Sequence, residues 1–218
     1  MSALPKILPT SAARLLVEGS DDQFSIIEFT QRHGFDWKLP SQGLPFVHAC
    51  GSDEQVLADI PAAVNSYARL GIILDADDDP KVRWQRVRTI LEGKQIVVPD
   101  SPDGIGTVIA GARPGSRIGI WLMPDNRLAG RLEDFLTTLV PVEDKVWPHA
   151  KNSAVQAQSL GAPFKPIHLG KAQFRTWLAW QQEPGLPPGR AIHRRFLTHD
   201  SPVGLQFLAW FRRLFIEP

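Results

Sequence analysis

After an irregular lead-in at 1–13, residues 14–140 alternate between short apolar runs and segments with apolar residues at helical spacing. Apolar runs of this length, bounded by polar turns, are typical of strands buried on both faces of a parallel sheet. The helical spacing predicts a helix after each of them. We expect strands at 14–17, 46–50, 70–74 and 118–123, and further short strands at 96–98 and 107–109. We expect helices at 20–32, from a cap at Ser52 or Asp53 to about Val64, at 81–91 and at 132–140.

Beyond residue 140 the pattern is helical throughout. We expect helices at 143–159, 171–182 and 203–215, with a Pro- and Gly-rich linker at 184–189. Their aromatic residues lie at helical spacing, which favours core packing over a stacking platform for bases. This aromatic seam comprises Phe174, Trp177, Trp180, Phe207, Trp210 and Phe211.

Strand–helix alternation predicts an α/β fold with a four-stranded, mainly parallel sheet and helices on both faces. We expect this core at residues 12–140, and a helical extension packed on it at 141–218. The chain of 218 residues is long enough for a sizeable core without a disulfide or metal.

Composition and charge narrow the class of protein. A hydrophobic fraction of 43% and a charged fraction of 22% exclude a disordered or collagen-like chain. No apolar run is long enough to cross a membrane, the first residues lack a signal-peptide pattern, and Cys50 is the sole cysteine. We therefore expect a cytoplasmic protein. A homo-oligomer is compatible with the sequence. Residues 1–80 carry a net charge of −7, so this part of the surface would bind a polyanion only if cations were bound to it. The remainder of the chain is basic and could help to hold a polyanion.

Carboxylates follow three of the predicted strands. Glu18 follows the first, Asp75 and Asp77 follow the third, and Asp125 follows the strand at 118–123, with Glu133 at the next helix. The carboxyl ends of parallel strands share one edge of a sheet, where ligands bind. Carboxylates gathered there repel one another unless cations are bound, and oxygen ligands suit Mg²⁺ or Mn²⁺. Zinc is not expected, because the histidines and the cysteine show no ligand spacing.

The chain resembles the Toprim domain of topoisomerases, bacterial primases and OLD-type nucleases. Toprim domains place a Glu after their first strand and an Asp-x-Asp pair after the third, which Glu18, Asp75 and Asp77 match in order and spacing. The segments at 119–134 and 171–185 resemble a family of stand-alone bacterial Toprim-like proteins.

The resemblance implies metal-dependent phosphoryl transfer on nucleic acid, most simply by a nuclease. Asp75 and Asp77 would hold one Mg²⁺, and Glu18 would be a ligand or the general acid/base. Lys171 would stabilise charge on the phosphate. A second metal would involve further carboxylates, namely Asp22, Asp79 or Glu133.

Departures from the relatives leave an alternative open. Topoisomerases of this superfamily use a tyrosine nucleophile, but the sole tyrosine here, Tyr67, lies in a predicted helix, where a packing role is simpler. The zinc module of primases is absent, and so is an ATP-binding Gly-x-x-x-x-Gly-Lys-Ser/Thr motif. The alternative is a non-catalytic, metal-binding module that docks a partner protein such as a separate ATPase chain.

Simpler interpretations exist for parts of the pattern. Asp75 to Asp79 resembles a calcium loop, but Pro80 and Arg86 occupy positions where an EF-hand has Gly and Glu. Asp79 before Pro80 also predicts a helix N-terminus. A receiver-like phospho-acceptor domain is a further α/β candidate, although its acidic pair would directly follow the first strand. Arg83 and Arg86 are candidates for contact with a nucleic-acid backbone, or else belong to a solvated helix face.

Overall fold

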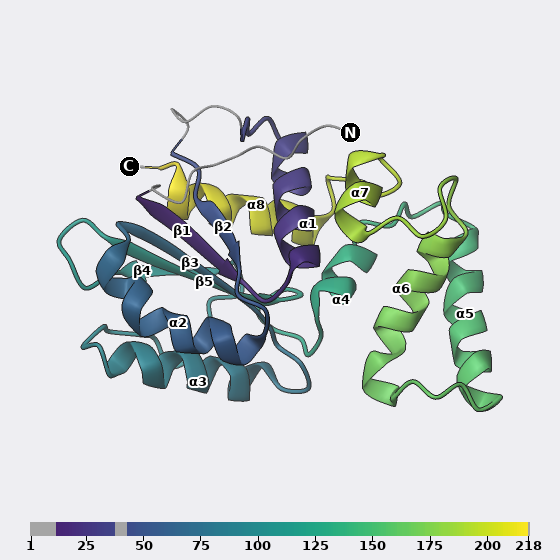
Figure 1. The fold of residues 1–218 in the computed structure, drawn as a ribbon, viewed down its shortest axis with the longest axis horizontal. Helices are drawn as coiled ribbons and strands as arrows, with labels where there is room; N and C mark the ends of the chain where they lie inside the picture. The colour runs from purple at the N-terminus through teal and green to yellow at the C-terminus, as the bar shows by residue number, and fades with distance from the viewer. Residues whose placement is uncertain (1–11, 38–42, 218) are drawn as a thin grey trace.

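The computed structural model describes residues 12–37 and 43–217, which form a mainly parallel sheet with helices on both faces (Figure 1). In chain order the elements are β1 (Ala13–Val17), α1 (Ser20–Arg32), β2 (Phe46–Ala49), α2 (Asp53–Ser66), β3 (Arg69–Asp75), α3 (Pro80–Glu92), β4 (Thr107–Ala110), β5 (Arg117–Met123), α4 (Leu132–Thr137), α5 (Val146–Ser159), the 3₁₀ helix η2 (Pro166–His168), α6 (Leu169–Ala179), α7 (Pro188–His193) and α8 (Pro202–Phe215).

The sheet has the strand order β2-β1-β3-β5-β4, and its first four strands are parallel. The α/β prediction is therefore confirmed, but the strand count of four is wrong. The segment at 107–109, predicted as a short strand, forms part of β4, which pairs antiparallel with β5. The segment at 96–98 is not a strand: Ile96 and Val98 instead pack into the core beneath α3.

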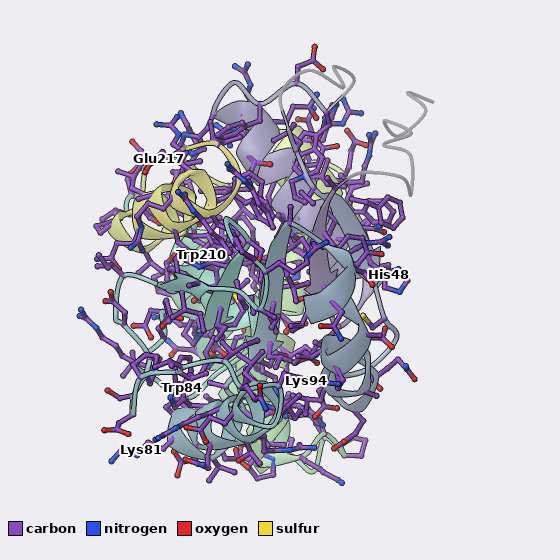
Figure 2. All side chains as sticks on the ribbon, turned by 90° about the vertical axis from the view of Figure 1, so that its left-hand side faces the viewer. His48, Lys81, Trp84, Lys94, Trp210 and Glu217 are labelled. Atoms are coloured by element: carbon purple, nitrogen blue, oxygen red, sulfur yellow. The ribbon has the colours of Figure 1, made fainter. Side chains whose placement is uncertain are left out.

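Side-chain alternation divides the core into two layers. Ile72 and Leu74 of β3 face one layer, with α2 and α3, whereas Ile73 faces the other, with α1, α4 and the C-terminal helices. Trp84 and Trp210, labelled in Figure 2, belong to the two different layers. Both faces of β3 and β5 are thus buried, as the unbroken apolar runs predict.

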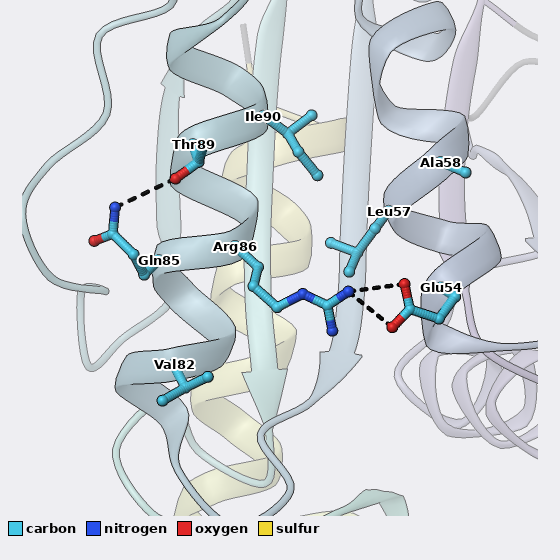
Figure 3. A pocket seen from close by; sticks show the side chains of 8 residues that line it. All are labelled: Glu54, Leu57, Ala58, Val82, Gln85, Arg86, Thr89 and Ile90. Atoms are coloured by element: carbon cyan, nitrogen blue, oxygen red, sulfur yellow. Dashed lines mark hydrogen bonds and ion pairs between the residues drawn. The ribbon is translucent and has the colours of Figure 1, made fainter.

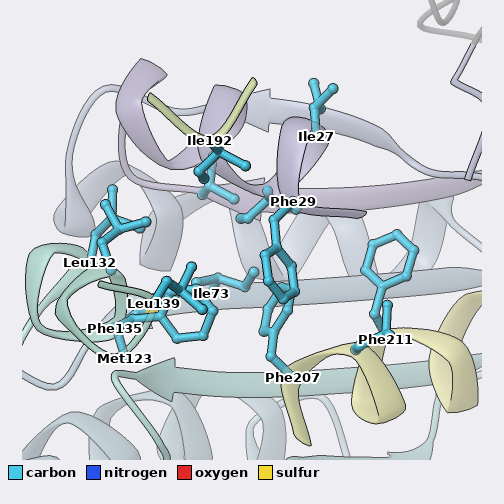
Figure 4. Close-up of a cluster of buried hydrophobic side chains, with 14 of the residues drawn as sticks. Ile27, Phe29, Ile73, Met123, Leu132, Phe135, Leu139, Ile192, Phe207 and Phe211 are labelled. Atoms are coloured by element: carbon cyan, nitrogen blue, oxygen red, sulfur yellow. The ribbon is translucent and has the colours of Figure 1, made fainter. Parts of the chain in front are cut away.

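The C-terminal helices form part of the main core rather than a separate one. Phe207 of α8 packs with Phe29 of α1 and Phe135 of α4, and Phe211 of α8 packs with Phe207 (Figure 4). The aromatic seam is confirmed as core with one exception. Trp180 is 45% exposed and stacks on His149.

Two helix starts differ from the prediction, because capping hydrogen bonds and proline positions set where these helices begin. The predicted helix at 143–159 begins later, at Val146, because Asp144 accepts hydrogen bonds from the amides of Val146 and Trp147. The linker at 184–189 runs directly into a short helix, α7, whose first residues are Pro188 and Gly189. The part of the chain that the structure describes contains no helix long and apolar enough to cross a membrane.

Two glycines allow α8 to lie close against the sheet. Gly71 of β3 and Gly119 of β5 are paired in register and face α8. A Cβ atom on Gly119 would lie 2.4 Å from Cδ2 of Leu214 and 3.1 Å from Cζ2 of Trp210, and both of these side chains are fully buried. The sheet and α8 therefore approach each other at a distance that no larger residue allows.

We predict that Gly119→Ala lowers the free energy of unfolding by about 1–3 kcal/mol, because the buried side chains of α8 cannot move aside. Urea denaturation followed by circular dichroism measures the change. The control is Gly93→Ala at the exposed end of α3, where φ is −62° and the new Cβ meets atoms only at 3.4 Å. A loss of stability in Gly93→Ala as large as in Gly119→Ala would contradict this explanation.

Candidate metal centre

The carboxyl edge of the sheet brings together carboxylates from three segments distant in sequence. Glu18 directly follows β1, Asp75 is the last residue of β3, and Glu133 lies in the first turn of α4, after β5. Since β3 is paired in parallel with both β1 and β5, these three segments emerge side by side. Asp22 joins them from the first turn of α1.

Backbone amides hold three of these side chains in place. The amide of Asp75 donates to Oε1 of Glu18 at 2.8 Å, and the amide of Leu132 donates to Oδ1 of Asp75 at 2.9 Å. The amide of Gly19 donates to Oδ2 of Asp22 at 3.1 Å. The carboxylates are therefore held in place by amides at the carboxyl end of β3, at the first residue of α4 and directly before α1.

Burial and mutual repulsion disfavour the ionised state of this group. Burial raises the pKa of Asp22 to about 7, with a further contribution from the charge of Glu18. Burial raises the pKa of Asp75 well above its usual value, with the charges of Glu18 and Asp22 adding to the effect. The pKa of Glu18 is raised as well, mainly by burial. A bound cation would relieve this repulsion.

Helix α6 supplies positive charge to the same edge. Nζ of Lys171 lies 3.1 Å from Oε1 of Glu133, a side chain that is only 7% exposed. A guanidinium nitrogen of Arg175, one helical turn later, lies 3.9 Å from the same oxygen and also pairs with Asp21. Lys171 and Arg175 thus present two cations on one face of α6 beside the acidic cluster.

Asp77 is bound by two arginines rather than left open to the edge. Its Oδ2 pairs with Arg83, and its Oδ1 accepts from Nε of Arg131 at 2.9 Å. Arg83 is buried and also donates to Oδ2 of Asp53 at 2.7 Å. Asp77 has a left-handed backbone, with φ of 53°, and exchanges two backbone hydrogen bonds with Gly130. Asp77 therefore ties the loop after β3 to the loop before α4.

The remaining predicted site residues have other partners. Asp79 is exposed and caps α3, accepting from the amide of Lys81 at 2.8 Å, which confirms the helix N-terminus predicted there. Arg86 pairs with Glu54 of α2 at 2.8 Å and remains 41% exposed at its side chain. Asp125 accepts from the amides of Arg127 and Leu128 and so stabilises a turn.

A groove between α2 and α3, of about 640 Å³, contains the Arg86–Glu54 ion pair (Figure 3). Its other lining residues come from the same two helices and include Leu57, Val82 and Ile90. None of the carboxylates of the sheet edge lines this groove, so it is separate from the candidate metal centre.

The edge carboxylates fit a hard divalent cation by their chemistry. Their donors are all oxygens, and burial has already raised the pKa of three of them. No three of their side chains, among the described residues, bring oxygens within 4.8 Å of one another. Mg²⁺ keeps several waters and needs only one or two carboxylates together with substrate phosphates, so this spacing suits Mg²⁺ better than a closed protein cage.

Two cations near the site, Arg175 and Arg131, were not predicted from the sequence. Arg175 lies four residues after Lys171, so the helical spacing of α6 was the signal that could have found it. Arg131 directly precedes α4, but nothing in its local sequence indicates a pairing with Asp77, 54 positions away. His168 extends this contact, because its Nδ1 lies 3.0 Å from a guanidinium nitrogen of Arg131.

The raised pKa of Asp22 predicts a pH-dependent stability. Between about pH 4 and pH 7 the folded chain holds a proton on Asp22 that the unfolded chain releases, so the free energy of unfolding falls as the pH rises through this window. Asp22→Asn keeps an oxygen acceptor for the amide of Gly19 but has no carboxyl group that can bind or release a proton in this pH range. We expect the slope to become shallower by about 1 kcal/mol per pH unit.

Urea titrations across this pH window in a chelating buffer measure the slope. The control is Asp100→Asn, at a side chain that is 94% exposed and pairs with Arg88, which should retain the wild-type slope. Parallel pH curves for Asp22→Asn and the wild type would show that the Asp22 carboxyl does not hold the proton.

Comparisons with known proteins identify a family but no annotated relative. Neither the curated proteins nor the solved structures contain a match to the chain. A comparison with protein families matches residues 12–216 to the family described as "Protein of unknown function (DUF3226)". This match spans nearly all the residues that build the sheet, the acidic edge and the C-terminal helices, and the chain therefore belongs to the DUF3226 family.

Proposed function

We propose that this protein is a Mg²⁺- or Mn²⁺-dependent phosphoryl-transfer enzyme that acts on nucleic acid, most simply as a nuclease, in the cytoplasm. The observation that carries the proposal is the cluster of buried Asp22 with half-buried Glu18 and Asp75, all three with a raised pKa, beside two cations of α6. A carboxylate cluster next to lysine and arginine suits a substrate that brings both a metal ion and phosphate oxygens.

The acidic residues divide into metal ligands and a proton carrier. Glu18 and Asp75 would hold the metal, which when bound supplies charge neutralisation at the phosphate and a lowered pKa of water. Asp22, with a pKa of about 7, can hold or release a proton at neutral pH. A carboxyl with this pKa suits a general acid or base. Asp77 contributes by fixing the loops around the site through Arg83 and Arg131.

The cations of α6 would bind the substrate backbone. Lys171 is 52% exposed at its side chain, so its ammonium is accessible to a phosphate oxygen while Glu133 orients it. Arg175 offers a planar guanidinium for a second oxygen. Arg86 is exposed and could extend the contact, whereas Arg83 is buried among carboxylates and would act through Asp77.

A second candidate function is a metal-binding module that docks a partner such as an ATPase chain. The observation favouring it is the helix pair α5–α6, which lies to one side of the sheet layers in Figure 1. Leu160 and Trp180, at the ends of these helices, are 80% and 45% exposed. Cleavage by the isolated chain would exclude this candidate as the sole function.

We predict that Mg²⁺ raises the melting temperature of the metal-free protein at mildly alkaline pH, where Asp22 is ionised. A metal at about 100 times its dissociation constant adds about 2.7 kcal/mol to the free energy of unfolding. Asp75→Asn keeps an acceptor for Leu132 but removes the charge, so we expect the Mg²⁺ effect to disappear in this variant. Scanning calorimetry with and without Mg²⁺ measures it, and an equal rise in both proteins would exclude Asp75 as a ligand.

We predict that Asp75→Asn lowers the cleavage of mixed-sequence DNA and RNA oligonucleotides by at least about a hundredfold, the scale of losing one charge-stabilising group at an enzyme site. Lys171→Ala should mainly weaken substrate binding. The assay uses Mn²⁺ or Mg²⁺ with a chelator blank, and Asp100→Asn is the control for an exposed carboxylate. Cleavage that persists in Asp75→Asn would reveal a contaminating nuclease or a different site.

A further inference from the structure

A second group of potential metal ligands lies between the edge strand β2 and helix α2. Nε2 of His48, Sγ of Cys50 and a carboxylate oxygen of Asp59 all lie within 4.8 Å of one another. Among the described residues, no other group of three histidine, cysteine or acidic side chains brings its ligand atoms this close together. Unlike the acidic edge, it combines nitrogen, sulfur and oxygen donors.

The fold brings these three residues together from two elements. His48 and Cys50 are two positions apart along the extended chain at β2, so both side chains point to the face covered by α2, whereas Val47 points to the opposite layer. Asp59 reaches them from α2. Figure 2 shows His48 at the margin of the molecule, and its side chain is 42% exposed, so an ion has access from solvent.

Neighbouring groups already orient two of the ligands. Nε2 of Gln55 donates to Oδ1 of Asp59 at 3.0 Å, which leaves Oδ2 facing Nε2 of His48 at 3.9 Å. The amide of Cys50 donates to the carbonyl oxygen of Val17 at 2.9 Å and fixes the backbone beneath the thiol. Such supporting hydrogen bonds are typical of residues around metal ligands.

The distance between the His48 and Asp59 donors is close to that between two ligands of a tetrahedral zinc site. Zn–N and Zn–O bonds of about 2.1 Å place neighbouring ligand atoms about 3.4 Å apart in a tetrahedron. His48 and Asp59 would therefore need to approach by only about half an ångström, and both side chains are partly exposed. A thiolate and an imidazole select a borderline-soft ion such as Zn²⁺ over Mg²⁺ or Ca²⁺.

We propose that His48, Cys50 and Asp59 form a binding site for Zn²⁺ that fastens the edge strand β2 to α2, with water or an external donor as the fourth ligand. As the sulfur–zinc bond forms, the thiol loses its proton to solvent, so the site changes from a neutral thiol to a bound thiolate. Burial and the nearby Asp59 raise the pKa of the Cys50 thiol to about 12, so without metal the thiol keeps that proton. The proposal is independent of the proposed phosphoryl transfer, since none of its residues lies in the acidic cluster.

The experiment titrates the full chain with Zn²⁺ by calorimetry and with Co²⁺ by absorption spectroscopy. We expect one Zn²⁺ per chain with a dissociation constant in the micromolar range or below, and a thiolate-to-cobalt charge-transfer band. Because Cys50 is the sole cysteine of the chain, such a band can come from no other residue. Mg²⁺ should not compete for this site.

Two variants test the ligands, and a third serves as the control. Cys50→Ser should abolish the charge-transfer band. Both Cys50→Ser and Asp59→Asn should weaken Zn²⁺ binding by at least about 10–100-fold, which is the loss when a residue that only supports a metal ligand is mutated. His149→Ala, at an exposed histidine that stacks on Trp180, is the matched control and should bind as the wild type does. Circular dichroism confirms that each variant is folded.

Two results would overturn the site. One is the absence of a charge-transfer band in the wild type at saturating Co²⁺. The other is Zn²⁺ binding that Cys50→Ser and Asp59→Asn both leave unchanged, which would assign the ion elsewhere. Loss of Zn²⁺ binding in Asp75→Asn but not in Cys50→Ser would likewise assign it to the acidic edge.

Discussion

The parallel pairing of β1, β3 and β5 is the constraint on which the rest of the structure depends. It directs the carboxyl ends of all three strands to one edge, so Glu18, Asp75 and the loop leading to Glu133 become neighbours. A parallel sheet needs cover on both faces, which α2 and α3 provide on one side and α1 and α8 on the other. Gly71 and Gly119 let α8 approach closely enough to complete that cover.

Some carboxylates at this edge form ion pairs and others do not, and this difference separates structural carboxylates from candidate metal ligands. Asp77 is neutralised by Arg83 and Arg131, and Glu133 faces Lys171 and Arg175. Glu18, Asp22 and Asp75 each accept a hydrogen bond from a backbone amide and have a raised pKa. The paired carboxylates are structural anchors, whereas the second set is where a cation would lower the free energy most.

The C-terminal helices connect the core to this chemistry. Helix α8 fills the layer beneath β3 and β5, and α6 carries Lys171 and Arg175 to the acidic edge. The cations that approach the site therefore come from a segment more than 90 residues after Asp75 in the chain. The His48, Cys50 and Asp59 group, by contrast, depends only on β2 and α2.

The sequence by itself determined the α/β class, the four parallel strands and the carboxylates at their ends, because apolar runs and polar turns are local signals. It also determined the aromatic core of α8, through helical spacing. Only the tertiary structure decided which carboxylates form ion pairs: Asp77 and Asp75 are equivalent in sequence, yet Arg83 and Arg131, from two other segments, pair with Asp77 and not with Asp75. It likewise decided that His48 and Cys50 meet Asp59, since ligands on a strand and a helix share no sequence period.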